Sequence, residues 1–125
     1  MGRILVVDDE TDIVRTVTRA LEQRGHVVTT AFDGAEAISQ MHADPPDCLV
    51  IDLQLPKIDG QEVARRLKAD PATRRVPILM MCASYLALES ADDGPDKGAD
   101  EFVVKPFLRD TLVRQVERLL ARRVS

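Results

Sequence analysis

The sequence predicts an α/β fold, a doubly wound parallel sheet of five strands with helices on both faces. Short apolar runs that suit buried strands alternate with longer segments whose apolar residues recur at helical spacing. The alternation repeats five times, and parallel strands need such crossover helices between them. A chain of 125 residues is long enough for one domain with a sizeable core. We therefore expect residues 1–125 to form a single domain.

The first two strands flank a helix. Residues 4–7 are a continuous apolar run, which is typical of a strand buried on both faces. Residues 11–24 repeat apolar side chains at helical spacing, and Gly25 follows as a C-terminal stop. The β-branched stretch 26–31 predicts the second strand.

The middle of the chain has two helices that begin with the same motif. Asp33 and Asp59 each stand three residues before a Glu, and this capping-box spacing predicts a helix start at both places. The first of these helices is expected to reach about Ala43. Between the two helices, the apolar run 48–51 predicts the third strand.

The last part of the chain holds two more strands and the final helix. Residues 78–82 and 102–104 are the expected strands, and apolar residues at helical spacing mark a helix through 112–120. By alternation, a fourth helix belongs between Ser84 and Asp100. Gly94-Pro95 lies inside that stretch and predicts a shortened or distorted helix, because a proline within a helix costs about 3 kcal/mol.

Composition excludes several functional classes. The apolar fraction of 45% and the absence of any apolar run near ~20 residues argue against disorder and against a membrane protein. The net charge of −4 and the aromatic fraction of 3%, with no Trp, argue against a nucleic-acid surface.

Two cysteines predict a reducing, cytoplasmic compartment. Cys48 and Cys82 are expected about 13 Å apart, too far for a disulfide.

Charged residues follow three of the predicted strands. Asp8 and Asp9 follow the first strand, Asp52 follows the third, and Lys105 follows the fifth. Because the carboxyl ends of parallel strands share one edge of the sheet, where ligands bind, we expect these side chains to meet there. Each Asp taken alone is most simply a turn or helix-capping residue. The four together predict a site.

Three carboxylates in one crevice raise one another's pKa, and a hard divalent cation such as Mg²⁺ relieves that repulsion. A site of this kind can hold a phosphoryl group, with Asp52 as the nucleophile and Lys105 neutralising charge on the transferred group. Asp52 is the best nucleophile candidate because it stands alone after the most central strand. A phosphohydrolase with an Asp nucleophile would need that residue after the first strand, in an Asp-x-Asp pattern that Asp8-Asp9-Glu10 does not provide.

Four motifs carry a resemblance to a known family. Residues 7–10 (Val-Asp-Asp-Glu), 52–60 (Asp-Leu-Gln-Leu-Pro-Lys-Ile-Asp-Gly), 98–100 (Gly-Ala-Asp) and 105–107 (Lys-Pro-Phe) resemble the receiver domain of two-component response regulators, in order and over nearly the whole chain. The resemblance implies a flavodoxin-like (βα)5 fold with strand order 2-1-3-4-5. It also implies a cis Lys105–Pro106 bond.

The same resemblance implies a function. A histidine kinase or phosphotransfer protein would transfer a phosphoryl group to Asp52, and Lys105 would contact the phosphoryl oxygens. Mg²⁺ would be held by Asp9, Asp52 and the backbone carbonyl of Gln54, with Asp8 acting partly through water. The protein would catalyse only its own phosphoryl transfer and dephosphorylation, so we do not expect a classical enzyme.

Two positions depart from the family pattern. Cys82 stands where receivers usually carry Thr or Ser, and Phe102 stands at the switch aromatic, often Tyr. Three interpretations of Cys82 are open: it is a small buried hydrophobe, it makes a weak contact to the phosphoryl group, or it is a redox-sensitive thiol. Phe102 is either the switch aromatic or an ordinary side chain at the edge of the sheet. We do not expect coupling between the two positions through a hydroxyl group. Coupling through steric contact stays open.

The output of such a domain must reach another molecule. In the family, the face formed by helix four, strand five and helix five contacts a downstream protein, an output domain or a second copy. No helix-turn-helix is present in these 125 residues, so direct nucleic-acid binding is not expected. The alternative function is a receiver-like module that dimerises or docks without phosphorylation. The replaced switch residues favour this alternative, and the intact acidic residues with Lys105 oppose it.

Overall fold

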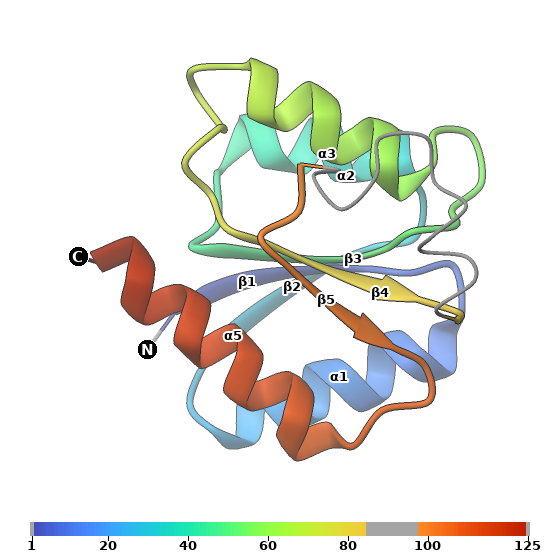
Figure 1. The fold of residues 1–125 in the computed structure, drawn as a ribbon, viewed down its shortest axis with the longest axis vertical. Helices are drawn as coiled ribbons and strands as arrows, with labels where there is room; N and C mark the ends of the chain where they lie inside the picture. Colours follow the sequence, from blue (N-terminus) through green and yellow to red (C-terminus); the bar gives the residue numbers. More distant parts are fainter. Residues whose placement is uncertain (1, 85–97, 125) are drawn as a thin grey trace.

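The computed structural model describes residues 2–84 and 98–124, which build a parallel five-stranded sheet between two layers of helices (Figure 1). The strand order is β2-β1-β3-β4-β5, so the predicted flavodoxin-like topology is confirmed. The strands are β1 (Arg3–Val7), β2 (Val27–Ala31), β3 (Cys48–Asp52), β4 (Ile78–Cys82) and β5 (Glu101–Val104). The helices are α1 (Thr11–Gln23), α2 (Gly34–Ala43), α3 (Gly60–Ala69) and α5 (Arg109–Val124). The helix expected between Ser84 and Asp100, with its Gly94-Pro95 distortion, falls largely outside the described residues.

The core has two parts, one on each face of the sheet. Successive residues of β1 point to opposite faces, as the pleat requires. Leu5 and Val7 pack with the apolar sides of α2 and α3, whereas Ile4 and Val6 pack with those of α1 and α5. Figure 1 shows these two helix pairs on either side of the sheet. All five residues of β3 are buried, which explains its continuous apolar run.

Two helices start at the predicted caps. The Asp33 carboxylate accepts a hydrogen bond from the Glu36 amide at 2.8 Å, and Asp59 accepts one from the Glu62 amide at 2.8 Å. These bonds satisfy amides that have no partner within their own helices. The capping motifs therefore set the first residues of α2 and α3, which follow the strands β2 and β3.

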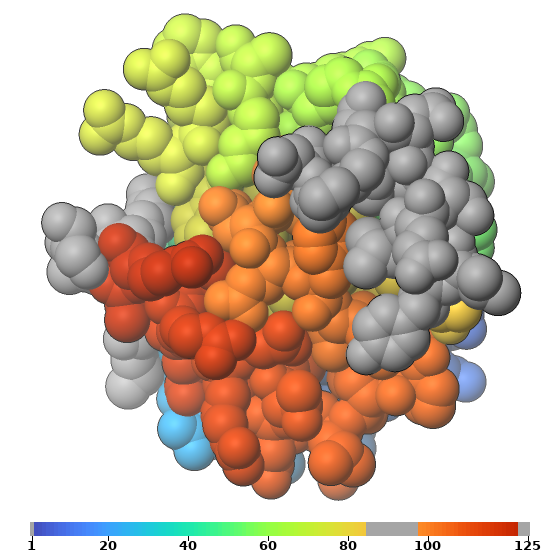
Figure 2. Space-filling view, in the orientation of Figure 1, coloured from blue at the N-terminus to red at the C-terminus, as the bar shows by residue number. Residues whose placement is uncertain are grey.

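Helix α5 is tied to the rest of the domain by polar contacts. On the face drawn in Figure 2, β5 (orange) and α5 (red) lie side by side, and the Glu101 carboxylate of β5 binds Arg118 of α5. The buried His26 ring accepts a hydrogen bond from the Gly2 amide through Nδ1, which leaves Nε2 to donate to Glu117 at 3.1 Å. His26 therefore has a structural role, because it joins the start of the chain to α5.

Among the helices of the described residues, none combines the length and the apolar character that a bilayer crossing requires.

The prediction that Cys48 and Cys82 do not pair is confirmed, since both are buried thiols outside any disulfide. The register explains this, because Leu49 lies opposite Ile78 and places Cys48 well before Cys82 along the neighbouring strand.

Candidate functional site

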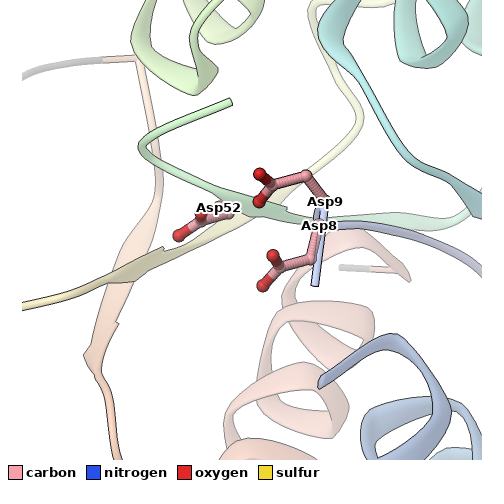
Figure 3. A group of neighbouring side chains, drawn as sticks. All are labelled: Asp8, Asp9 and Asp52. Carbon is pink, nitrogen blue, oxygen red and sulfur yellow. The ribbon is translucent and has the colours of Figure 1, made fainter. Parts of the chain in front are cut away.

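The predicted acidic residues meet at one edge of the sheet. β1 and β3 are neighbours, with Val7 opposite Ile51, so Asp8 and Asp9 emerge beside Asp52. One carboxylate oxygen from each of the three lies within 4.8 Å of the others. Figure 3 shows the three side chains projecting to the same side of this edge. Asp8 and Asp52 are buried, and Asp9 is exposed to solvent.

Lys105 completes the cluster from the end of β5. Its Nζ lies 2.7 Å from Asp8 Oδ2 and 3.3 Å from Asp52 Oδ1. The ammonium also lies 3.4 Å from Glu10 Oε1 at the rim of the site. The next peptide bond, Lys105–Pro106, is cis, as the resemblance implied.

Backbone hydrogen bonds hold these residues in place. The Asp8 amide donates to the Ala31 carbonyl at the end of β2, and the Asp8 carboxylate accepts from the Glu10 amide at 3.0 Å. The Lys105 amide donates to the Cys82 carbonyl at 2.7 Å. Each strand end is therefore anchored to its neighbour, so the charged side chains stand on rigid backbone.

Gly60 brings the start of α3 against the end of β3. A Cβ atom at position 60 would lie 2.0 Å from the Asp52 backbone oxygen, a distance that no side chain can adopt. The Gly60 amide also donates to the Leu53 carbonyl at 2.8 Å. Glycine at this position lets the helix begin directly behind Asp52.

Burial sets the protonation of the two inner carboxylates. Burial raises the pKa of Asp52 to about 6, the Asp8 charge adds to the rise, and the Lys105 ammonium opposes it. Burial also raises the pKa of Asp8, although hydrogen bonds from Lys105 and the Glu10 amide oppose the rise. Burial alone would lower the pKa of Lys105, but its contacts with Asp8 and Asp52 outweigh that effect and raise it. The site therefore stores repulsion among carboxylates that a further cation would relieve.

The cluster has the donors that Mg²⁺ prefers. Three carboxylates offer hard oxygen ligands at one partly open point, and Mg²⁺ binds through one or two carboxylates while keeping waters and phosphate oxygens as its other ligands. Receiver domains generally bind Mg²⁺ in an acidic pocket of this kind. The exposed Asp9 leaves one side of the cluster accessible.

The remaining predicted site residues lie nearby but in different surroundings. Cys82 ends β4 and is fully buried within the core cluster that faces α2 and α3. Phe102 lies in β5, is half-buried and packs against the same cluster. Gln54 is an exposed residue of the loop that follows Asp52. The burial of Cys82 agrees with its interpretation as a small buried hydrophobe. The functional roles of Cys82, Phe102 and Gln54 stay predictions.

Sequence reasoning gave no role to two contacts beside the site. Glu10 reaches Lys105, and its place directly after Asp8-Asp9 was the available signal. Lys57, in the loop that carries Gln54, forms an ion pair with Asp33 at the start of α2. No spacing in the sequence predicts this second pair, because it joins two loops that only the fold brings together.

The fold and the acidic cluster together define a receiver-type signalling domain, and comparisons with known proteins give the family. The family model described as the response regulator receiver domain matches residues 4–117. The chain belongs to the receiver domain family of two-component response regulators. Such domains are signalling modules whose state changes when they are phosphorylated. They are not classical enzymes.

Individual relatives agree with this family. The chain is 40% identical to the transcriptional regulatory protein PrrA of Mycobacterium tuberculosis over 126 residues, covering 98% of this chain and 52% of PrrA. It is 38% identical to the response regulator MprA of Mycobacterium avium over 120 residues, covering 96% of this chain and 51% of MprA. The chain thus spans about half the length of these curated relatives.

Two of the solved structures that match do so over nearly their whole length. The chemotaxis response regulator CheY4 of Vibrio cholerae has a TM-score of 0.86 at 30% identity, covering 95% of this chain and 98% of that one. The receiver domain of the Francisella response regulator 1452 has a TM-score of 0.86 at 29% identity, covering 98% of both chains.

Proposed function

We propose that this receiver domain accepts a phosphoryl group on Asp52 from a histidine kinase or a phosphotransfer protein, in a reaction that needs Mg²⁺. The observation that carries the proposal is the convergence of Asp8, Asp9 and Asp52 within 4.8 Å, with the Lys105 ammonium 3.3 Å from Asp52. A lone buried carboxylate would be a poor acceptor for an anionic group. Here the Lys105 ammonium, together with a cation bound by the three carboxylates, would supply the positive charge that such a group needs.

Asp52 is the residue placed to act as nucleophile. One of its carboxylate oxygens attacks the phosphorus of the donor's phosphohistidine, so an O–P bond forms as the P–N bond breaks. The histidine nitrogen leaves with the bonding electron pair and is available for protonation by solvent. Because the pKa of Asp52 is about 6, most of its population carries the required negative charge at neutral pH.

The surrounding residues hold the transferred group. Lys105 would donate from Nζ to a phosphoryl oxygen, moving from its present contact with Asp52. Asp9, Asp52 and the Gln54 backbone carbonyl would bind Mg²⁺, and Asp8 would bind partly through water. The bound cation supplies positive charge that offsets the developing charge on the phosphoryl oxygens.

We further propose that phosphorylation alters the surface formed by β5 and α5. Phe102 lies on β5, one of the two elements of that surface, and it packs on the same core cluster as Cys82. Without a hydroxyl at position 82, coupling between the two residues would be steric. The partner would be a downstream protein, an output domain or a second copy of the chain. Two buried thiols outside a disulfide suit a reducing, cytoplasmic setting.

The test is covalent labelling read by intact mass. The full chain is incubated with acetyl phosphate and Mg²⁺, and we expect one added phosphoryl group that is lost in base, as an acyl phosphate should be. Asp52→Asn should gain none, and chelation of Mg²⁺ should abolish the reaction. The exposed acid Glu22 provides a matched control, and Glu22→Gln should label like the parent.

A parent chain that gains no phosphoryl group under these conditions would contradict the proposal. That result would favour the alternative function, a module that docks without phosphorylation. The observation that supports this alternative is the presence of Cys82 and Phe102 at the two switch positions. A label that persists in Asp52→Asn would instead place the acceptor elsewhere.

A further inference from the structure

The loop between β3 and α3 lies against the start of α2. Gly34 is the first residue of α2, and a Cβ atom there would lie 2.0 Å from the Ile58 carbonyl oxygen and 2.9 Å from its carbon. Real Cβ atoms do not approach other atoms so closely. The atoms in the way are backbone rather than the end of a flexible side chain, so the loop itself would have to move. Only glycine at position 34 permits this position of the loop.

A second contact joins the same two segments. Lys57 Nζ lies 3.2 Å from Asp33 Oδ2, and the other Asp33 oxygen caps α2. The hydrogen bond from the Glu36 amide, together with the Lys57 ammonium, holds the pKa of Asp33 below its usual value although burial opposes them. Asp33 is therefore an ionised residue that binds its own helix and, at the same time, the loop between β3 and α3. We call this loop, residues 53–59, the site loop.

Lys57 has an unusual backbone conformation. Its φ is +67°, and it is the only non-glycine residue with positive φ among residues 2–84 and 98–124. This region is uncommon for residues with a Cβ atom, and it persists where surrounding contacts hold it. The Asp33 ion pair and the Gly34–Ile58 contact lie on either side of the Lys57–Ile58 peptide bond and supply those contacts.

The loop is also closed on its other side. The Gly60 amide donates to the Leu53 carbonyl at 2.8 Å, and the Ile58 amide donates to the Pro56 carbonyl at 2.8 Å. Gln54 lies in the short span between the Leu53 and Pro56 carbonyls that accept these bonds. A shift at Ile58 has only a few residues over which to dissipate before it reaches the Gln54 carbonyl.

We propose that Gly34 and the Asp33–Lys57 pair are positioning residues that set the site loop for Mg²⁺ binding, an inference that rests on the proposed function. They act through the loop backbone, since neither Gly34 nor Lys57 belongs to the acidic cluster. Gly34 carries most of the effect, because its contact is between backbone atoms. The ion pair adds less, since the Lys57 side chain is 67% exposed and its charge is screened by solvent.

The test compares Mg²⁺ affinity by titration calorimetry with thermal stability. Gly34→Ala should weaken Mg²⁺ binding about tenfold, as loss of an outer-shell support does. If Gly34 mattered for stability alone, the variant would have a lower melting temperature and would bind Mg²⁺ as the parent does. Hydrogen exchange at the Ile58 and Gly60 amides should become faster in this variant.

Gly2→Ala is the matched control. A Cβ atom there would lie 2.8 Å from Leu120 Cδ2, at the opposite end of β1 from the site. The atom in the way is the end of a flexible side chain, so this variant should lose less stability than Gly34→Ala and keep the Mg²⁺ affinity of the parent. Equal loss of affinity in both variants would overturn the inference, because it would show a general effect of destabilisation.

Two milder variants decide the question if Gly34→Ala does not fold. Lys57→Gln and Asp33→Asn should each weaken Mg²⁺ binding about two- to fivefold, and Asn still caps the helix. Unchanged affinity in both would overturn the inference while leaving the proposed function intact. A parent chain that neither binds Mg²⁺ nor accepts a phosphoryl group would remove the proposed function and this inference with it.

Discussion

The Lys105 ammonium lies 2.7 Å from the Asp8 carboxylate, and the two residues are 97 positions apart in the chain. Asp8 is fully buried, so its charge depends on this partner. The same ammonium also contacts Asp52. Two buried carboxylates thus share one cation.

Asp52→Asn should stabilise the protein without Mg²⁺ at pH 8. Folding raises the pKa of Asp52 from 3.8 to about 6, so within this range the native state holds a proton that the unfolded chain has released. The free energy of unfolding of the parent therefore falls as the pH rises through that window. We expect the variant to gain about 1–3 kcal/mol at pH 8 and nothing below pH 4, measured by urea unfolding. Glu22→Gln, on an exposed helix position, is the control, and a gain that does not depend on pH would contradict the assignment.

Mg²⁺ should raise the melting temperature at pH 8 and lose this effect as the pH falls below about 6. A cation binds the ionised carboxylates, and protonation of Asp52 competes with it. The measurement is thermal unfolding with Mg²⁺ or chelator at both pH values. Asp52→Asn should show a smaller gain at pH 8. Equal stabilisation of the parent at pH 8 and pH 5 would argue that Mg²⁺ binds elsewhere.

Lys105→Met should slow labelling by acetyl phosphate about a hundredfold at saturating Mg²⁺. The variant removes the proposed hydrogen-bond donor to the transferred group, and such donors contribute on this scale. Lys68 offers a matched control, because it is a partly buried lysine that pairs with Asp100 away from the site. Intact mass recorded over time gives both rates. A Lys105→Met rate equal to that of Lys68→Met would count against a role for Lys105 in transfer.

Cys48 and Cys82 should not react with Ellman's reagent in the native protein. Both residues are fully buried, so a bulky reagent reaches them only after local or global opening. In guanidinium chloride both thiols should react at once, which provides the internal control. Rapid native labelling of one thiol, mapped to Cys82 by mass spectrometry, would instead support the reading of Cys82 as a redox-sensitive residue.

The sequence was enough to predict the strands, the described helices and the acidic site. Val, Ile and Leu runs mark the strands, and capping motifs at Asp33 and Asp59 mark two helix starts. Asp8, Asp9, Asp52 and Lys105 could be grouped without coordinates, because parallel strands place all their carboxyl ends at one edge. Local periodicity and one topological rule carry that information.

Tertiary structure alone decided the contacts between loops. The Gly34–Ile58 contact and the Asp33–Lys57 pair join segments that share no periodicity, so no spacing rule predicts them. The raised pKa of Asp52 is likewise a product of burial and of the distances to Asp8 and Lys105. The sequence determined which chemical groups stand at the edge of the sheet. Packing determined how deeply each is buried and what holds it, because desolvation and charge interactions depend on three-dimensional distance.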